Sequence, residues 1–184
     1  MFVKQPTVWA LLLVAVCHFA SGDEVNIDDF SINPESRWQY LSDQVMGGVS
    51  SGGVEYRHLD THSLAILDGQ VSTENNGGFI QIRSKVSKAQ VVDASGVYLR
   101  ARGNNQQYYI HLRTTGTMLP WQYYQANFDV TEDWQEFKLP LEQFSRSGNW
   151  LSKRVNPRTI RSIGIVAFGR DHQAKIEIDE IGFY

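Results

Sequence analysis

The side chains of this chain that could do chemistry do not combine into a metal-binding pattern. His58 and His62 are four residues apart, which is the spacing of a zinc-binding helix. The residues between them are Leu59-Asp60-Thr61, however, without the glutamate that follows the first histidine in a His-Glu-x-x-His metalloprotease. We interpret the two histidines as exposed loop residues, with a metal-binding pair as the alternative.

Serine and carboxylate chemistry is poorly represented as well. Gly48-Val49-Ser50-Ser51-Gly52 matches the letters G-x-S-x-G, but a hydrolase elbow needs a strand before it and a helix after it, and no helix is expected there. No Lys-Ser or Lys-Thr pair follows the glycines near residue 50, so a phosphate loop is not indicated. Adjacent carboxylates such as Glu132 and Asp133 would point to opposite faces of an extended chain, whereas glycosidase chemistry needs two carboxyl groups at a defined separation across a cleft. The sequence therefore predicts no enzyme.

Two polar segments with paired glycines are the most specific feature of the chain. They are Asp43-Gln44-Val45-Met46-Gly47-Gly48-Val49-Ser50 and Glu74-Asn75-Asn76-Gly77-Gly78-Phe79. The pairs Gly47-Gly48 and Gly77-Gly78 are interpreted as structural turns, because glycine accepts positive φ and lets another chain or a ligand approach closely.

The polar side chains of these segments admit two roles. As ligand contacts, Asp43 and Ser50 would present polar groups at a rim, with Met46 as an adaptable apolar contact. As structural groups, Asp43 would accept hydrogen bonds from turn amides and Met46 would fill the core. Asn75 and Asn76 are either amide contacts for a ligand or left-handed turn residues.

The N-terminus has the three parts of a secretory signal peptide. Lys4 is followed by the apolar run Val8 to Val16 and by the small residues Ala20-Ser21-Gly22. The apolar run is shorter than the roughly 20 residues that span a bilayer. We therefore expect residues 1–22 to be removed, leaving an exported, periplasmic or secreted domain of residues 23–184 with no stable membrane span.

Charge and cysteine content exclude further classes of function. The formal net charge is −3, with no run of Lys or Arg, which argues against a nucleic-acid partner. Cys17 is the single cysteine and would leave with the signal peptide. The mature domain must then rely on its hydrophobic core, without disulfides, redox thiols or cysteine-bound zinc.

Alternation of period two dominates the rest of the chain and predicts an all-β fold. Val97–Arg102 and Tyr108–Arg113 alternate on either side of Gly103-Asn104-Asn105, which predicts a β-hairpin. Pro140–Ser145 hints at a helical turn. Further strands are expected at Ser63–Leu67, Gly78–Arg83, Tyr123–Val130, Gln135–Leu139, Ser162–Phe168 and Lys175–Phe183. Short strands at this spacing favour a single antiparallel sandwich.

The two glycine segments, with landmarks along nearly the whole mature chain, resemble the complex I intermediate-associated protein 30 family. The landmarks are Trp38, Arg100-Ala101-Arg102-Gly103, Tyr109 to Arg113, Tyr124 to Phe128, Trp134, Leu139-Pro140 and Ser162-Ile163-Gly164. The resemblance implies a galactose-binding-like jelly roll of two antiparallel sheets. Known members assist assembly of mitochondrial complex I, whereas this chain carries an export signal.

The predicted hairpin also yields a candidate binding face. If Val97, Leu99, Ala101, Ile110 and Leu112 face the core, then Arg100, Arg102, Tyr109, His111 and Arg113 project to the other side. Tyr124 is assigned to the same site. Aromatic rings beside guanidinium groups suit stacking on a sugar or peptide, and an ordinary solvated sheet face is the alternative.

A structural calcium ion is the one cofactor that the resemblance suggests. Related jelly rolls tie their first and last strands through oxygen ligands, and the candidates here are Asp28, Asp29, Asp179 and Glu180. Surface charge at strand ends is the alternative, and no other cofactor is expected. The predicted function is a non-catalytic binding or assembly module for a protein partner in the cell envelope. A carbohydrate-binding module is the alternative, and an envelope enzyme is the third possibility.

Overall fold

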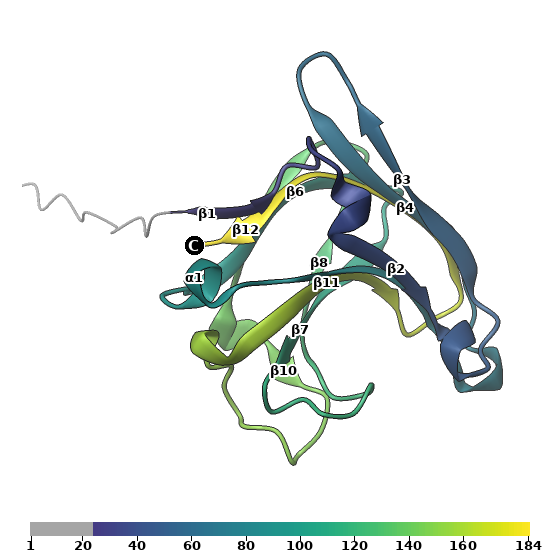
Figure 1. Cartoon of the computed structure of the whole chain (residues 1–184). Helices are drawn as coiled ribbons and strands as arrows, with labels where there is room; N and C mark the ends of the chain where they lie inside the picture. Colours follow the sequence, from purple (N-terminus) through teal and green to yellow (C-terminus); the bar gives the residue numbers. More distant parts are fainter. Residues whose placement is uncertain (1–23) are drawn as a thin grey trace, which may run out of the picture.

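The computed structural model describes residues 24–184, which form a sandwich of two antiparallel sheets (Figure 1). The predicted signal peptide, residues 1–22, lies outside the described residues. The all-β jelly roll expected from the sequence is confirmed. Sheet A contains β1 (Val25–Asp28), β3 (Ser51–His58), β4 (Ser63–Val71), β6 (Gly96–Gly103), β9 (Gln135–Pro140) and β12 (His172–Phe183). Sheet B contains β2 (Trp38–Ser42), β5 (Phe79–Lys85), β7 (Gln107–Thr114), β8 (Tyr124–Asp129), β10 (Ser145–Arg146) and β11 (Ile160–Phe168).

The longest strand, β12, lies in the middle of sheet A. The order of this sheet is β3-β4-β12-β6-β9, and β1 pairs with the end of β12 beyond β4. Sheet B has the order β10-β8-β7-β11-β5-β2, so its centre is the pair β7 and β11. Neighbours in the sheets are mostly distant in sequence, and the two sheets therefore form from interleaved parts of the chain.

The core lies between the sheets and takes one side of each strand. Leu99, Ile110, Leu112, Ile165 and Ile178 are fully buried there, at the positions that the alternation predicts for inward residues. Each such side chain contributes about 1.5–3 kcal/mol when removed from water. Tyr108 also joins the sheets, because its hydroxyl on β7 accepts a hydrogen bond from the amide of Lys175 on β12.

Helical structure is confined to short connections. The helix α1 (Lys88–Val91) follows β5, and five 3-10 helices lie at η1 (Pro34–Ser36), η2 (Asp43–Met46), η3 (Glu74–Asn76), η4 (Leu141–Gln143) and η5 (Pro157–Thr159). The helical turn expected at 140–145 is η4. Within residues 24–184, no helix has the length and apolar character needed to cross a bilayer.

The predicted hairpin at residues 97–113 is wrong. The two strands exist, but β6 belongs to sheet A, where it pairs with β12 and β9, and β7 belongs to sheet B, where it pairs with β11 and β8. The turn between them is tied to other segments instead of closing on itself. Gly103 donates its amide to the carbonyl of Thr131, and Asn104 donates its amide to the carbonyl of Lys175. The chain therefore crosses from one sheet to the other at this corner.

Candidate functional site

Asp43 is a buried hydrogen-bond acceptor that joins the two glycine segments. Its side chain is inaccessible to solvent and accepts hydrogen bonds from the amides of Ser50, Gly78 and Phe79 and from the Ser50 hydroxyl. Burial acts to raise the pKa of Asp43, but the hydrogen bonds from Gly78, Ser50 and Phe79 outweigh it and lower the pKa. The carboxylate is thus ionised and enclosed, as the structural interpretation of this segment requires.

The glycines around Asp43 are needed for two different reasons. Gly47 has φ of 89° and Gly78 has φ of 125°, which side chains rarely adopt. A Cβ atom on Gly48 or Gly77 would lie 2.4 Å from the Asp43 carboxyl group. The close approach that the glycines permit is therefore that of the chain's own aspartate.

Ser50 is buried with Asp43, so neither presents a polar group at the rim, whereas Asn75, Asn76 and Met46 lie at the surface. Asn75 and Asn76 are exposed and have φ of 55° and 58°, so they act as left-handed turn residues. Met46 is 53% exposed, which shows that the structural role considered for it, filling the core, is wrong.

The predicted binding face is divided between the two outer faces of the sandwich. Arg100 and Arg102 lie on the outer face of sheet A, whereas Tyr109, His111 and Arg113 lie on the outer face of sheet B. The inward and outward assignment was correct within each strand, but the sheets carry these strands on opposite sides of the molecule. One surface containing all five side chains is therefore excluded.

On sheet A the arginines are neutralised by carboxylates of the neighbouring strand. Arg100 forms an ion pair with Asp179, and Arg102 forms one with Glu177 at 2.7 Å. Both guanidinium groups lie 5.0 Å from the ring centre of Trp134, in cation–π geometry. Trp134 directly precedes β9, the other strand that pairs with β6. Both arginines are therefore engaged by groups of the chain itself, although their side chains stay 44% and 41% exposed.

The calcium candidates are engaged in similar contacts. Asp28 is buried and accepts hydrogen bonds from Arg37, from the Trp38 indole and from the amide of Phe30. Asp29 and Glu180 line a surface pocket of about 550 Å³ together with Arg100 and the paired Asp179. Among residues 24–184 no group of three potential ligands is placed to hold a metal ion. A guanidinium inside the pocket also opposes a cation.

The outer face of sheet B carries an aromatic cluster formed by Tyr109, His111, Tyr123 and Phe168. The His111 and Tyr123 rings stack with centroids 4.0 Å apart, and Tyr109 meets Phe168 edge to face at 5.7 Å. Phe168 also contacts His111 at 5.6 Å. Tyr109, Tyr123 and Phe168 remain partly exposed. The rings therefore form a fixed platform open to solvent.

The cluster contains two buried polar atoms, Nε2 of His111 and Oε1 of Gln125, on residues that lie opposite one another on β7 and β8. Burial lowers the pKa of His111 to about 3, although hydrogen bonding to Gln125 acts in the other direction. The imidazole is consequently neutral at physiological pH.

Arg113 lies beside the cluster and holds the loop that borders it. Its guanidinium donates to the carbonyl oxygens of Thr117 and Leu119 at 3.1 and 2.9 Å. That loop presents Trp121, which is 55% exposed, and it is joined through Ser147 to the loop that presents Trp150, which is 65% exposed. Exposed tryptophans on neighbouring loops are typical of binding surfaces.

Tyr124 does not belong to this surface, and its assignment to the site is wrong. It is buried, and its hydroxyl donates to the carbonyl of Ser152. Tyr123, one residue earlier, occupies the outward position. The sequence contains a signal for this choice, because the apolar residues of β8 fall at every second position and define the inward side. That side consists of Tyr124, Ala126, Phe128 and Val130.

Several solved structures similar to this chain are carbohydrate-binding modules. One is the family 11 module of a cellulosomal cellulase of Clostridium thermocellum, with a TM-score of 0.70, 13% identity and coverage of 88% of this chain and 94% of that one. The same type of module from Clostridium thermocellum was solved in complex with a β-1,3-1,4-mixed-linked tetrasaccharide. It has a TM-score of 0.69 and 13% identity, with coverage of 87% of this chain and 94% of that one. A family 30 module has a TM-score of 0.51 and 14% identity, with coverage of 74% of this chain and 92% of that one. At these identities the likeness establishes the fold.

The family follows from the sequence itself. Among curated proteins none matches the chain closely enough to be called a relative. The model of the family Complex I intermediate-associated protein 30, however, matches residues 28–178, which include both glycine segments and every strand that carries the aromatic cluster. The chain therefore belongs to the complex I intermediate-associated protein 30 family.

Proposed function

We propose that this protein is a non-catalytic module that binds a glycan chain on the outer face of sheet B. The observation that carries the proposal is the aromatic cluster, in which the rings of Tyr109, Tyr123 and Phe168 remain partly exposed. Exposed ring faces stack on the apolar faces of sugars.

Amide side chains complete the chemistry of this face. Gln81, Gln125 and Asn127 point outward from β5 and β8 beside the rings, at positions fixed by the strand register. Each amide offers both donors and an acceptor, which matches the mixed character of sugar hydroxyls. Because the rings already contact one another, little side-chain freedom would be lost on binding.

The structural likeness supports the same ligand class. The Clostridium thermocellum module has this fold and was solved with a mixed-linked tetrasaccharide. The predicted signal peptide at residues 1–22 would bring the domain to the envelope or the exterior, where polysaccharides are found. We include export in the proposal on that ground.

Binding of the protein to a glycan array and to soluble mixed-linked β-glucan tests the proposal, with affinity measured by calorimetry. Tyr109→Ala should weaken binding about thirtyfold, the effect of losing about 2 kcal/mol at a central aromatic contact. Tyr109→Phe keeps the ring and is the matched control. It should retain binding, since the Tyr109 hydroxyl already donates to Gln107 within the chain.

Thermal unfolding of each variant shows whether a loss of binding reflects a loss of fold. If the folded protein binds no glycan, the proposal is wrong. The same conclusion follows if Tyr109→Ala binds as tightly as the parent protein. A protein partner, the principal alternative from the sequence, would then be sought by cross-linking at Trp121 and Trp150.

A further inference from the structure

We infer that the glycan is acidic, with a uronate carboxylate bound between Arg83 and Arg113 on the outer face of sheet B. This inference rests on the proposed function and specifies its ligand. Arg83 was not singled out by the sequence, because the strand Gly78–Arg83 was expected without an assignment of its faces.

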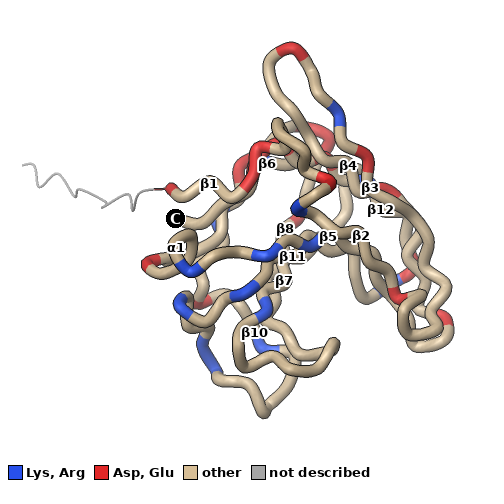
Figure 2. Tube along the Cα trace, in the orientation of Figure 1, with Lys and Arg blue, Asp and Glu red and all other residues tan. Residues whose placement is uncertain are grey.

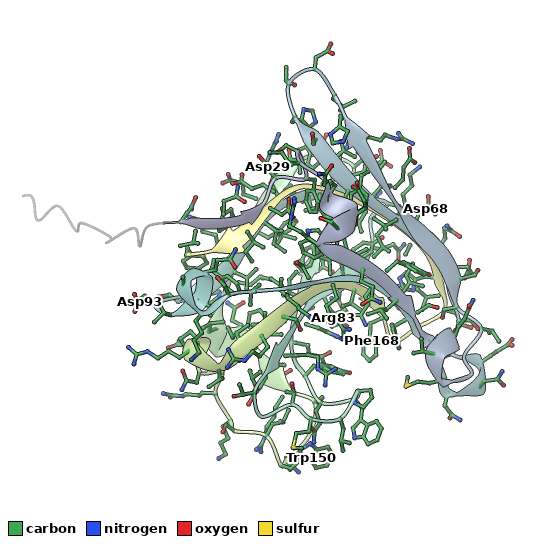
Figure 3. All side chains as sticks on the ribbon, in the orientation of Figure 1. Asp29, Asp68, Arg83, Asp93, Trp150 and Phe168 are labelled. Carbon is green, nitrogen blue, oxygen red and sulfur yellow. The ribbon has the colours of Figure 1, made fainter. Side chains whose placement is uncertain are left out.

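The strand register brings the two arginines to opposite sides of β11. Arg83 on β5 lies opposite Gly164, and Arg113 on β7 lies opposite Ser162. Lys85 on β5 also lies opposite Ser162, so three basic residues surround this short stretch of β11. In Figure 3 Arg83 and Phe168 lie over the strands of sheet B, apart from Asp29 and Asp68, and the register places Phe168 opposite Phe79, four residues along β5 from Arg83.

Between Arg83 and Arg113 the outward residues of β11 are small, so the surface of β11 lies below the side chains of the flanking strands. Ser162 and Gly164 point outward yet are buried, since longer side chains on the flanking strands cover them. A Cβ atom on Gly164 would lie 3.0 Å from Oε1 of Gln81, which shows that the Gln81 amide reaches over the glycine. An incoming group at this place would meet one amide and the arginines.

Arg83, Lys85 and Arg113 form no ion pair within the described residues, although Glu35 lines the same surface pocket as Arg83 and Lys85. The five ion pairs found there each include a strand residue of sheet A, and none includes an outward residue of sheet B. Figure 2 shows the same separation, with Lys and Arg gathered over β5, β7, β10 and β11 and most Asp and Glu over the strands of sheet A.

The two arginines also act on one another. Burial lowers the pKa of Arg113, and the positive charge of Arg83 lowers it further. Arg113 donates to neutral carbonyl groups, and Arg83 has no hydrogen bond or ion pair among the described residues. A pair of repelling guanidinium groups is stabilised by an anion between them.

A carboxylate fits this pair better than other anions. The planar fork of a guanidinium matches a carboxylate with two parallel hydrogen bonds. The aromatic cluster lies on the next strand positions, so a sugar ring that carries the carboxylate would reach Tyr109 and His111. This arrangement favours a uronic-acid polymer over an acidic peptide, because an extended peptide pairs with a sheet edge.

The test compares polygalacturonate with its methyl ester, which has the same rings without the charge, and with neutral mixed-linked β-glucan. The protein should bind polygalacturonate about tenfold more tightly than the ester, and added salt should reduce the difference. Arg83→Gln should weaken binding of polygalacturonate about tenfold more than it weakens binding of the neutral polymers. Arg57→Gln removes the same charge from sheet A and should have no effect.

The outcomes separate this inference from the proposed function. Equal affinity for polygalacturonate and its ester overturns the acidic ligand, and so does an Arg83→Gln variant that binds polygalacturonate like the parent. In both cases glycan binding itself stands. Binding of an acidic peptide in place of every glycan, or no glycan binding at all, overturns both. Arg83→Lys provides a second variant, which keeps the charge without the fork and should recover part of the affinity.

Discussion

The carboxylate of Asp43 accepts a hydrogen bond from the backbone amide of Gly78, 35 residues further along the chain. The same carboxylate accepts the amide of Ser50 at 3.0 Å. The two glycine segments that are separate in the sequence thus enclose one buried charge. The residues that make these two segments recognisable are therefore residues that hold the buried Asp43 carboxylate.

Asp43→Asn should destabilise the protein at neutral pH by about 1.5–3 kcal/mol, because it removes hydrogen bonds to a charged group. The pKa of Asp43 is lowered in the folded state. Its contribution is therefore present above the ordinary aspartate pKa of about 4 and is lost as the pH falls through the folded pKa. Urea unfolding at pH 7 and pH 3 should show the difference between variant and parent shrink at low pH. Equal stability at pH 7 would contradict the role assigned to Asp43.

Gly48→Ala should cost about 1–3 kcal/mol, since the added methyl group would collide with the Asp43 carboxyl group. Gly53→Ala is the matched control, because a Cβ atom there meets nothing within 4 Å, and it should change stability by less than about 0.5 kcal/mol. Thermal melting of the two variants measures the contrast. Similar melting temperatures would show that the backbone around Asp43 adjusts without cost.

Burial of neutral His111 should make stability depend on pH. Its folded pKa of about 3 lies below the ordinary value of 6.5, so the unfolded chain binds the proton first as the pH falls. Stability should be level above pH 6.5 and decline from there toward pH 3. His111→Phe keeps a ring against Tyr123 and removes this proton, so its unfolding midpoint should decline less steeply over the same range. A variant that follows the parent curve would argue against a buried neutral imidazole.

Export predicts a shortened protein. The tripartite pattern of residues 1–22 predicts cleavage after Gly22, so intact mass measurement of the secreted or envelope fraction should give a chain that begins at Asp23. Recovery of the form that begins at Met1 from soluble cytoplasm would exclude the expected route.

The alternation of apolar residues was sufficient to predict the strands of the core, as at Val97, Leu99 and Ile110, because burial on one face imposes period two. It could not predict which sheet each strand joins. The turn at Gly103-Asn104 has the composition of a hairpin, but its hydrogen bonds run to Thr131 and Lys175, which are distant in sequence. The strand β3 was not predicted, since Gly52 and Gly53 weaken its pattern and its residues are mostly exposed.

The candidate site was predicted only in part, because the sequence does not show which strands pair with one another. Tyr109, His111 and Arg113 were placed on one outward face from a single strand, and the structure keeps them together. Phe168 and Arg83 come from β11 and β5, and Tyr123 directly precedes β8, so only the pairing of these strands brings the three residues to the same surface. Local patterns identify which residues point outward, but they do not identify their neighbours across a sheet.

The position of β12 has a consequence for the order in which the chain becomes folded during synthesis. This strand pairs with β4, β6 and β1, so these three strands cannot be joined into sheet A until residues 172–183 have been synthesised. A ribosome releases the chain from its N-terminus, at roughly 5–20 residues per second. The earlier strands must then wait with open edges for several seconds, in a form that invites pairing with other chains. The export that we propose would benefit from this delay, because a chain without a complete sheet A could still pass through a translocation channel before β12 completes the sheet.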